Sequence, residues 1–157
     1  SEEISWAISL IDSIRSARAQ INVPAGAKVP LVQVSISPAG QAALSANMAQ
    51  IQQMARITEV SQVFEMPKGA ITITAPQATF GLPLADIIDV AAEKMRLEKN
   101  MGKLAKELGG LRGRLNNPNF AASAPAEVLA ETRANLEARE EEEAKLSIAL
   151  ARLEEIG

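Results

Sequence analysis

The sequence has 157 residues, of which 47% are hydrophobic, enough for one ordinary domain or for a small domain with an extended arm. It contains neither cysteine nor histidine, so disulfides, thiolate or imidazole metal sites and Ser-His or Cys-His catalytic pairs are excluded. The formal net charge is −3, and no apolar run approaches the length of a membrane span, about 18 residues. We therefore expect a cytoplasmic protein without a membrane partner, and the sequence indicates no catalytic residue and no metal site.

Residues 3–22 are predicted to form a helix, because isoleucines and alanines recur at helical spacing from Ile4 to Ile21. The apolar face of this helix is broader than the following residues can cover, so we expect it to pack on other helices of a longer chain. The first residue is Ser1 rather than methionine, which favours the same interpretation. Turn-forming residues at 22–26 end the helix, and we place a boundary after residue 23.

Residues 24–83 are predicted to form a small sheet with one packed helix, an α+β arrangement. β-Branched residues dominate the first run of this segment and indicate a strand. Ser37 followed by Pro38 is typical of a helix N-cap with proline at the first helical position. The expected elements are strands at 29–36 and 57–63, a helix from Pro38 to about Met54, and a hairpin of 70–74 with 78–82.

The first 83 residues contain five basic and five acidic side chains. This balance predicts no patch that would attract a polyanion in this part of the chain. Its glycines are isolated and match neither a phosphate-binding loop nor a dinucleotide-binding fingerprint. We therefore expect a structural role for residues 1–83 and no nucleotide site.

Residues 84–157 are predicted to form a long antiparallel two-helix coiled-coil hairpin. Leucine-rich rows with alternating steps of three and four lie on both sides of a break at 116–118. Folding the chain at this break places Leu108 opposite Leu136, with nearly constant sums of residue numbers along the seam, as antiparallel helices of equal rise require. The rows are Ile87, Val90, Leu97, Met101, Leu104, Leu108, Leu111 and Leu115 in the first helix, and Leu129, Thr132, Leu136, Arg139, Glu143, Leu146, Leu150 and Leu153 in the second.

Two features predict weak places in this hairpin. Three seam positions of the second helix are polar, and we expect their stems to lie along the seam with their polar heads in water, not a buried functional ion pair. The first helix contains four glycines, each costing about 1 kcal/mol relative to alanine in a helix interior, so we predict higher mobility between Gly109 and Arg114. The polar seam residues are Thr132, Arg139 and Glu143, and the glycines are Gly102, Gly109, Gly110 and Gly113.

The two helices of the hairpin differ in charge, with seven basic against five acidic residues at 84–115 and four against nine at 116–157. Four basic residues recur in steps of three, four and three on the outer side of the first helix, and three arginines lie toward the tip. Such a row suits a phosphate backbone, because each contact releases counterions without reading sequence. The alternative is that these residues only keep an exposed helix soluble. The candidates are Arg96, Lys99, Lys103, Lys106, Arg112, Arg114 and Arg133.

Phe120 lies in the predicted tip loop, residues 116–124, where a lone aromatic either plugs the end of the hairpin or stacks on an exposed RNA base. We favour the plug, since an apolar ring near a helix end usually packs. The glutamate run at 140–143 does not indicate a cation site, because consecutive residues point all around a helix.

Segments along essentially the whole chain resemble the C-terminal part of bacterial valyl-tRNA synthetase. In the hairpin several short motifs match, and their combination makes the resemblance specific. Upstream, further matches lie at the end of the first helix. The matching residues are 83–89, 92–94, 96–99, 119–120 and 124–128 with Arg133 and Leu136 in the hairpin, and Ile14, Arg15, Arg18, 22–24 and Lys28 upstream.

The resemblance implies that residues 1–23 end an anticodon-binding helical bundle, that 24–83 form a small α/β domain, and that 84–157 form an arm holding the outer corner of tRNA(Val), where the D and T loops meet. It also implies a parent chain that is a class I aminoacyl-tRNA ligase, monomeric, using ATP, with catalytic, editing and anticodon-binding domains upstream. No cofactor is implied for the fragment itself, and none of the catalytic signature sequences occurs in it.

Two departures from the family shift the predicted tRNA contacts along the arm. Family members usually have Lys or Arg where Ser123 stands, and Lys where Asn135 follows Arg133. We therefore place more weight on the basic candidates than on the tip residues, namely on Arg96, Lys99, Lys103, Lys106, Arg112, Arg114 and Arg133. A second hypothesis is a structural module whose hairpin docks another coiled coil; salt-sensitive RNA binding would favour the first, and self-association without RNA binding the second.

Overall fold

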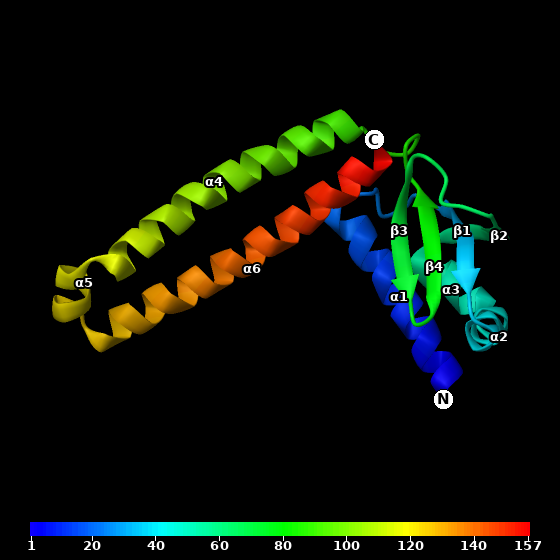
Figure 1. Cartoon of the computed structure of the whole chain (residues 1–157), viewed down its shortest axis with the longest axis horizontal. Helices are drawn as coiled ribbons and strands as arrows, with labels where there is room; N and C mark the ends of the chain where they lie inside the picture. The colour runs from blue at the N-terminus through cyan, green and yellow to red at the C-terminus, as the bar shows by residue number, and fades with distance from the viewer. The chain divides into compact units, whose positions relative to one another are not determined.

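The computed structural model describes every residue, Ser1–Gly157, and the chain divides into two compact units. Unit 1 comprises Ser1–Glu93 with Ala151–Gly157, and unit 2 comprises Lys94–Leu150. The predicted α+β class, a small sheet followed by a long helical hairpin, is confirmed (Figure 1). None of the helices combines the length and the apolar character needed to cross a bilayer. The elements are α1 (Glu2–Gln20), β1 (Val29–Ile36), α2 (Pro38–Ala46), α3 (Met48–Ala55), β2 (Ile57–Gln62), β3 (Ala70–Ala75), β4 (Ala78–Pro83), α4 (Val90–Asn116), α5 (Pro118–Ser123) and α6 (Ala126–Ile156).

Unit 1 is built on a four-stranded sheet in the order β2-β1-β4-β3. β1 and β2 are parallel, whereas β1–β4 and β3–β4 are antiparallel pairs. A parallel pair requires a crossover connection, which α2 and α3 supply between β1 and β2. The predicted strands are confirmed to within one residue at each end, and the β3–β4 hairpin turns at Pro76 and Gln77, where Gln77 takes a φ of 54°.

The core of unit 1 joins the sheet to α1. Leu10 and Ile14 of α1 and Phe80 of β4 are fully buried. The indole Nε1 of Trp6 donates a hydrogen bond to the carbonyl oxygen of Pro76 at 3.0 Å, and its ring meets Phe80 edge-on with 6.1 Å between ring centroids. These contacts fix α1 against the β3–β4 hairpin.

Part of the apolar face of α1 is not covered within the chain. Ile4 and Ile8 are 54% and 53% exposed, although Ile11, on the same side of the helix, is buried. The prediction that this face is broader than the chain can cover is confirmed. That other helices pack on it stays a prediction.

The single helix predicted from Pro38 to about Met54 is wrong in its continuity, because Asn47 divides it into α2 and α3. The start is as expected: the Ser37 hydroxyl accepts a hydrogen bond from the N–H of Gly40 at 3.0 Å. At the break, the Asn47 side-chain amide donates to the carbonyl oxygen of Ala43 at 2.9 Å. Asparagine competes in this way with the helical backbone, which explains the interruption.

Unit 2 is a helical hairpin in which α4 and α6 run antiparallel and α5 forms the tip (Figure 1). The leucine row of α4 faces inward. On α6, Thr132 is only 4% exposed, and its hydroxyl donates to the carbonyl oxygen of Val128 at 2.7 Å. The prediction that its head lies in water is therefore wrong: the hydroxyl is satisfied within its own helix. The buried residues of the α4 row are Leu97, Leu104, Leu108 and Leu111.

The ends of α4 differ from the predicted hairpin boundaries. Residues 85–88 form a turn followed by a bend, and α4 begins only at Val90, with an Asp89 side-chain oxygen accepting from the N–H of Ala92 at 3.1 Å. The predicted tip loop contains a short helix, α5, because Asn117 caps it by accepting from the N–H of Asn119 at 3.0 Å. Pro118 then occupies the first helical position.

Candidate nucleic-acid interface

The lysines predicted to bind RNA lie on the outer side of α4. Lys99, Lys103 and Lys106 are all exposed, and none of them forms an ion pair. Their spacing of four and three places them along one line, about half a helical turn away from the buried leucines. Arg96 continues this line toward the start of α4 and is exposed, but it has an interaction partner within the protein.

The same line continues past Lys106 with a glycine and an arginine. Gly110 and Arg114 follow at successive steps of four, and Arg114 is exposed in the last turn of α4, where a positive charge also suits the helix dipole. A Cβ placed on Gly110 would meet no atom within 4 Å, so packing does not require a glycine there. We call the line of Lys99, Lys103, Lys106, Gly110 and Arg114 the basic row.

Two predicted arginines lie outside the basic row and face carboxylates. Arg112 Nη2 is 3.7 Å from Glu140 Oε2 on α6, so part of its charge is compensated across the hairpin. Arg133 lines a shallow hollow on α6 together with Glu137, Glu140 and Glu141. The structure therefore brings Lys99, Lys103, Lys106 and Arg114 together, but not Arg112 or Arg133.

Phe120 lies on α5 at the tip of the hairpin, and its side chain is half-buried. The ring is partly covered, as the plug requires, and partly accessible, as stacking on a base requires. It makes no contact with another aromatic ring.

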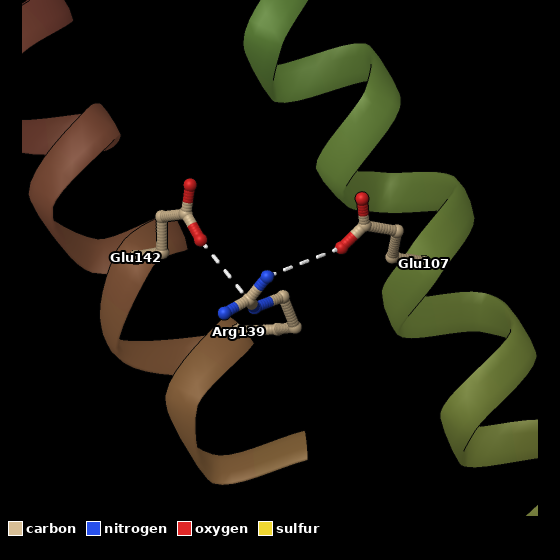
Figure 2. Close-up of polar contacts among 3 residues, drawn as sticks. All are labelled: Glu107, Arg139 and Glu142. Carbon is tan, nitrogen blue, oxygen red and sulfur yellow. Dashed lines mark ion pairs between the residues drawn. The ribbon is translucent and has the colours of Figure 1, made fainter. Parts of the chain in front are cut away.

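Arg139 of α6 links the two helices of the hairpin through an ion pair with α4 (Figure 2). Its Nη1 is 3.6 Å from Glu107 Oε2 on α4, and its Nε is 3.4 Å from Glu142 Oε2 on α6. The Nε atom is buried, and its contact with Glu142 lacks the geometry of a hydrogen bond. The three side chains are 41% to 55% exposed, so these ion pairs are expected to add little stability.

The glutamates at 140–143 occupy consecutive positions of α6, so their side chains point in different directions around the helix. Glu140 faces Arg112, and Glu142 faces Arg139. No group of three or more Asp or Glu side chains is arranged to hold a metal ion.

These features define an α+β protein with a helical hairpin arm, whose α4 carries an exposed row of basic residues. Residues 89–154 match the family model described as the valyl tRNA synthetase tRNA binding arm. This chain is therefore similar to the part of valyl-tRNA synthetases that includes this arm.

Curated relatives match far beyond the arm. The valine–tRNA ligase of Ruegeria pomeroyi is 61% identical over 155 residues, which is 99% of this chain and 15% of that protein. The valine–tRNA ligase of Cereibacter sphaeroides is 55% identical over 98% of this chain and 16% of its own length. That of Agrobacterium fabrum is 40% identical over 99% of this chain and 16% of its own length. The chain thus spans about one sixth of the length of these relatives.

Proposed function

We propose that this chain is the non-catalytic tRNA-binding region of a valine–tRNA ligase. The hairpin holds the outer corner of tRNA(Val), where the D and T loops meet, while aminoacylation takes place elsewhere in the same protein. In this proposal the whole protein is a class I, ATP-dependent, cytoplasmic and monomeric ligase, with its catalytic, editing and anticodon-binding domains upstream. The chain itself supplies positioning and electrostatic attraction, not bond chemistry.

The observation that carries this proposal is the basic row. Its lysines are exposed, lie on one line and are not neutralised by carboxylates, so their charge is available to an external polyanion. Lysines bind phosphate groups as point charges, and each contact releases counterions from the nucleic acid. Such contacts position an RNA without reading its bases. The family model that the arm matches is described as a tRNA binding arm, which supports tRNA as the RNA that is bound.

The other predicted residues take secondary roles. Arg96 extends the row toward the start of α4, and Phe120 touches RNA at the tip if its accessible side stacks on a base. Arg112 and Arg133 contribute less, because Glu140 lies beside both of them.

The test replaces Lys99, Lys103 and Lys106 with glutamine and measures tRNA binding over a range of salt concentrations. We expect the slope of log K against log salt to fall by about 2 to 3, since each lost phosphate contact removes about 0.7 to 0.9. A matched control removes Lys28, Lys68 and Lys145, which are exposed and lie outside the row. Equal slopes for the two variants would contradict the proposal, and concentration-dependent self-association without RNA binding would favour the coiled-coil docking module.

A further inference from the structure

Unit 1 contains a hollow of about 410 Å³ beside the second half of α1 and the end of α3. Three of its lining residues are arginines, Arg15, Arg18 and Arg56, and none is an aspartate or glutamate. The balanced charge of residues 1–83 predicted no positive patch in this part of the chain. That prediction is wrong, because the fold brings Arg56 next to two arginines that lie about 40 residues earlier.

Arg18 forms the rigid part of this hollow. The residue is 7% exposed, and its two terminal nitrogens donate to four carbonyl oxygens. It has no carboxylate partner, and its Nε makes no hydrogen bond. The guanidinium is therefore held in one orientation while its positive charge is not neutralised. Its acceptors are Ala27 at 2.6 Å, Pro24 at 3.1 Å, Arg56 at 3.3 Å and Ala55 at 3.4 Å.

Arg15 and Arg56 supply exposed charge at the rim. Both side chains are exposed, and neither forms an ion pair. Arg56 ends α3 in the left-handed region, with φ 55°, which is uncommon for a residue other than glycine, asparagine or aspartate. This conformation brings the charge of Arg56 close to Arg18. The pKa of the Arg18 guanidinium is lowered from its ordinary value, mainly by burial and secondly by the charge of Arg56.

A guanidinium remains protonated at any physiological pH, so the fold holds like charges together and leaves them uncompensated. An anion in the hollow would relieve this repulsion. Guanidinium groups match the oxygens of a phosphate in geometry as well as in charge. The rest of the wall includes Val23 and Met54, and Met54 is 52% exposed, so apolar surface is available beside the charges.

We infer that this hollow binds a phosphate group of an RNA backbone, giving the chain a second RNA contact outside the hairpin arm. The inference rests on the proposed function, because it takes RNA as the polyanion that the chain meets. Arg15 and Arg56 close on the phosphate from the rim, and the fixed Arg18 supplies a constant positive field from below. The adjoining sugar or base lies against the apolar wall formed by Val23 and Met54.

The main experiment replaces Arg15 with glutamine and Arg56 with asparagine in one variant and measures tRNA affinity and its salt dependence. Asparagine tolerates the left-handed conformation, so Arg56→Asn removes the charge without straining the backbone. Arg18 is left unchanged because it holds the fold together. A control variant with Lys28→Gln and Lys68→Gln removes two exposed charges of unit 1 that do not line the hollow.

We expect the hollow variant to bind tRNA about 5- to 50-fold more weakly and its salt slope to fall by about 1 to 2, with the control unchanged. Normal binding by the hollow variant, together with weakened binding by the variant lacking Lys99, Lys103 and Lys106, overturns this inference and leaves the proposed function standing. Normal tRNA binding by both variants overturns this inference and the proposed function together. Unfolding curves for each variant show whether a loss of binding reflects a loss of structure.

A second measurement locates the contact directly. A photo-crosslinking amino acid at Gln53, an exposed residue that lines the hollow, is compared with the same amino acid at Ser61, an exposed residue of β2 outside it. We expect crosslinks to tRNA from position 53 and not from position 61. Crosslinks from position 53 to protein instead of RNA would show that a protein segment fills the hollow, and would overturn the inference.

Discussion

Glu155 holds the backbone of Thr72 at the edge of the sheet: its Oε2 accepts a hydrogen bond from the Thr72 N–H at 2.6 Å. Arg152, three residues earlier on α6, donates to the carbonyl oxygen of Thr72 at 3.0 Å and to the Gln20 side chain at 2.7 Å. β3 is an edge strand of the sheet. The two side chains therefore occupy backbone groups that an open edge would offer to another chain.

Removing this edge cap with Arg152→Ala and Glu155→Ala should destabilise unit 1 by about 1 to 3 kcal/mol, because both backbone groups of Thr72 lose charge-assisted partners. Urea denaturation measures the change, and amide exchange at Thr72 should accelerate. Glu141→Ala with Lys145→Ala, on the exposed part of the same helix, is the control. An equal loss of stability in both variants would show that the cap has no special role.

The glycines of α4 should accept alanine with a gain in stability. A Cβ at Gly109 or Gly113 would meet no atom within 4 Å, so each substitution should stabilise the helix by about 0.5 to 1 kcal/mol. Gly81→Ala in β4 should have the opposite effect, since its Cβ would lie 2.5 Å from Met66 Sδ and 2.9 Å from Val32 Cγ2. Thermal unfolding of the three variants measures this difference in sign, and a loss of stability on changing Gly109 would contradict it.

A large side chain at Gly110 should weaken RNA binding without lowering the stability of the helix. Gly110 lies within the basic row, between Lys106 and Arg114, and faces open space. Gly110→Leu should therefore keep or improve helix stability while holding a phosphate backbone away from the neighbouring lysines. Filter binding of tRNA, with Ala138→Leu on the exposed side of α6 as control, measures the effect. Equal affinities would mean that RNA does not approach this part of α4 closely.

Arg139→Leu should be neutral or stabilising by up to about 1 kcal/mol. The ion pairs with Glu107 and Glu142 are about half exposed and therefore weak, while the buried Nε lacks a hydrogen bond. Leucine at this seam position restores an apolar contact with α4. Urea unfolding of the hairpin tests this, and a loss above 1 kcal/mol would mean that the ion pairs stabilise the hairpin more than their exposure indicates.

Local patterns in the sequence predicted most elements because each depends on neighbouring residues. The strands of unit 1 and the Ser37 cap follow from β-branched runs and a hydroxyl before proline, and the leucine row predicted the inner face of α4. Asn47 was missed as a helix break because its effect comes from a hydrogen bond to Ala43 that propensity alone does not reveal. The buried position of Thr132 was missed for a similar reason, since its hydroxyl is satisfied by Val128.

The candidate interface was predictable in part. The line of Lys99, Lys103 and Lys106 follows from helical spacing alone, but the carboxylates beside Arg133 depend on how neighbouring turns of α6 are arranged. The hollow of unit 1 could not be predicted, because Arg15 and Arg56 are distant in sequence and meet only after the chain has folded. A net charge summed over a segment contains no information about such clustering.

The bonding of Arg18 makes one side chain responsible for keeping three stretches of backbone in register. From α1 it reaches Pro24 and Ala27 in the following loop and Ala55 and Arg56 at the end of α3. A lysine would keep the charge, but its single nitrogen cannot span both pairs of oxygens. A single substitution of Arg18 would therefore release the loop and the end of α3 together, although it changes no predicted RNA-binding residue of the arm.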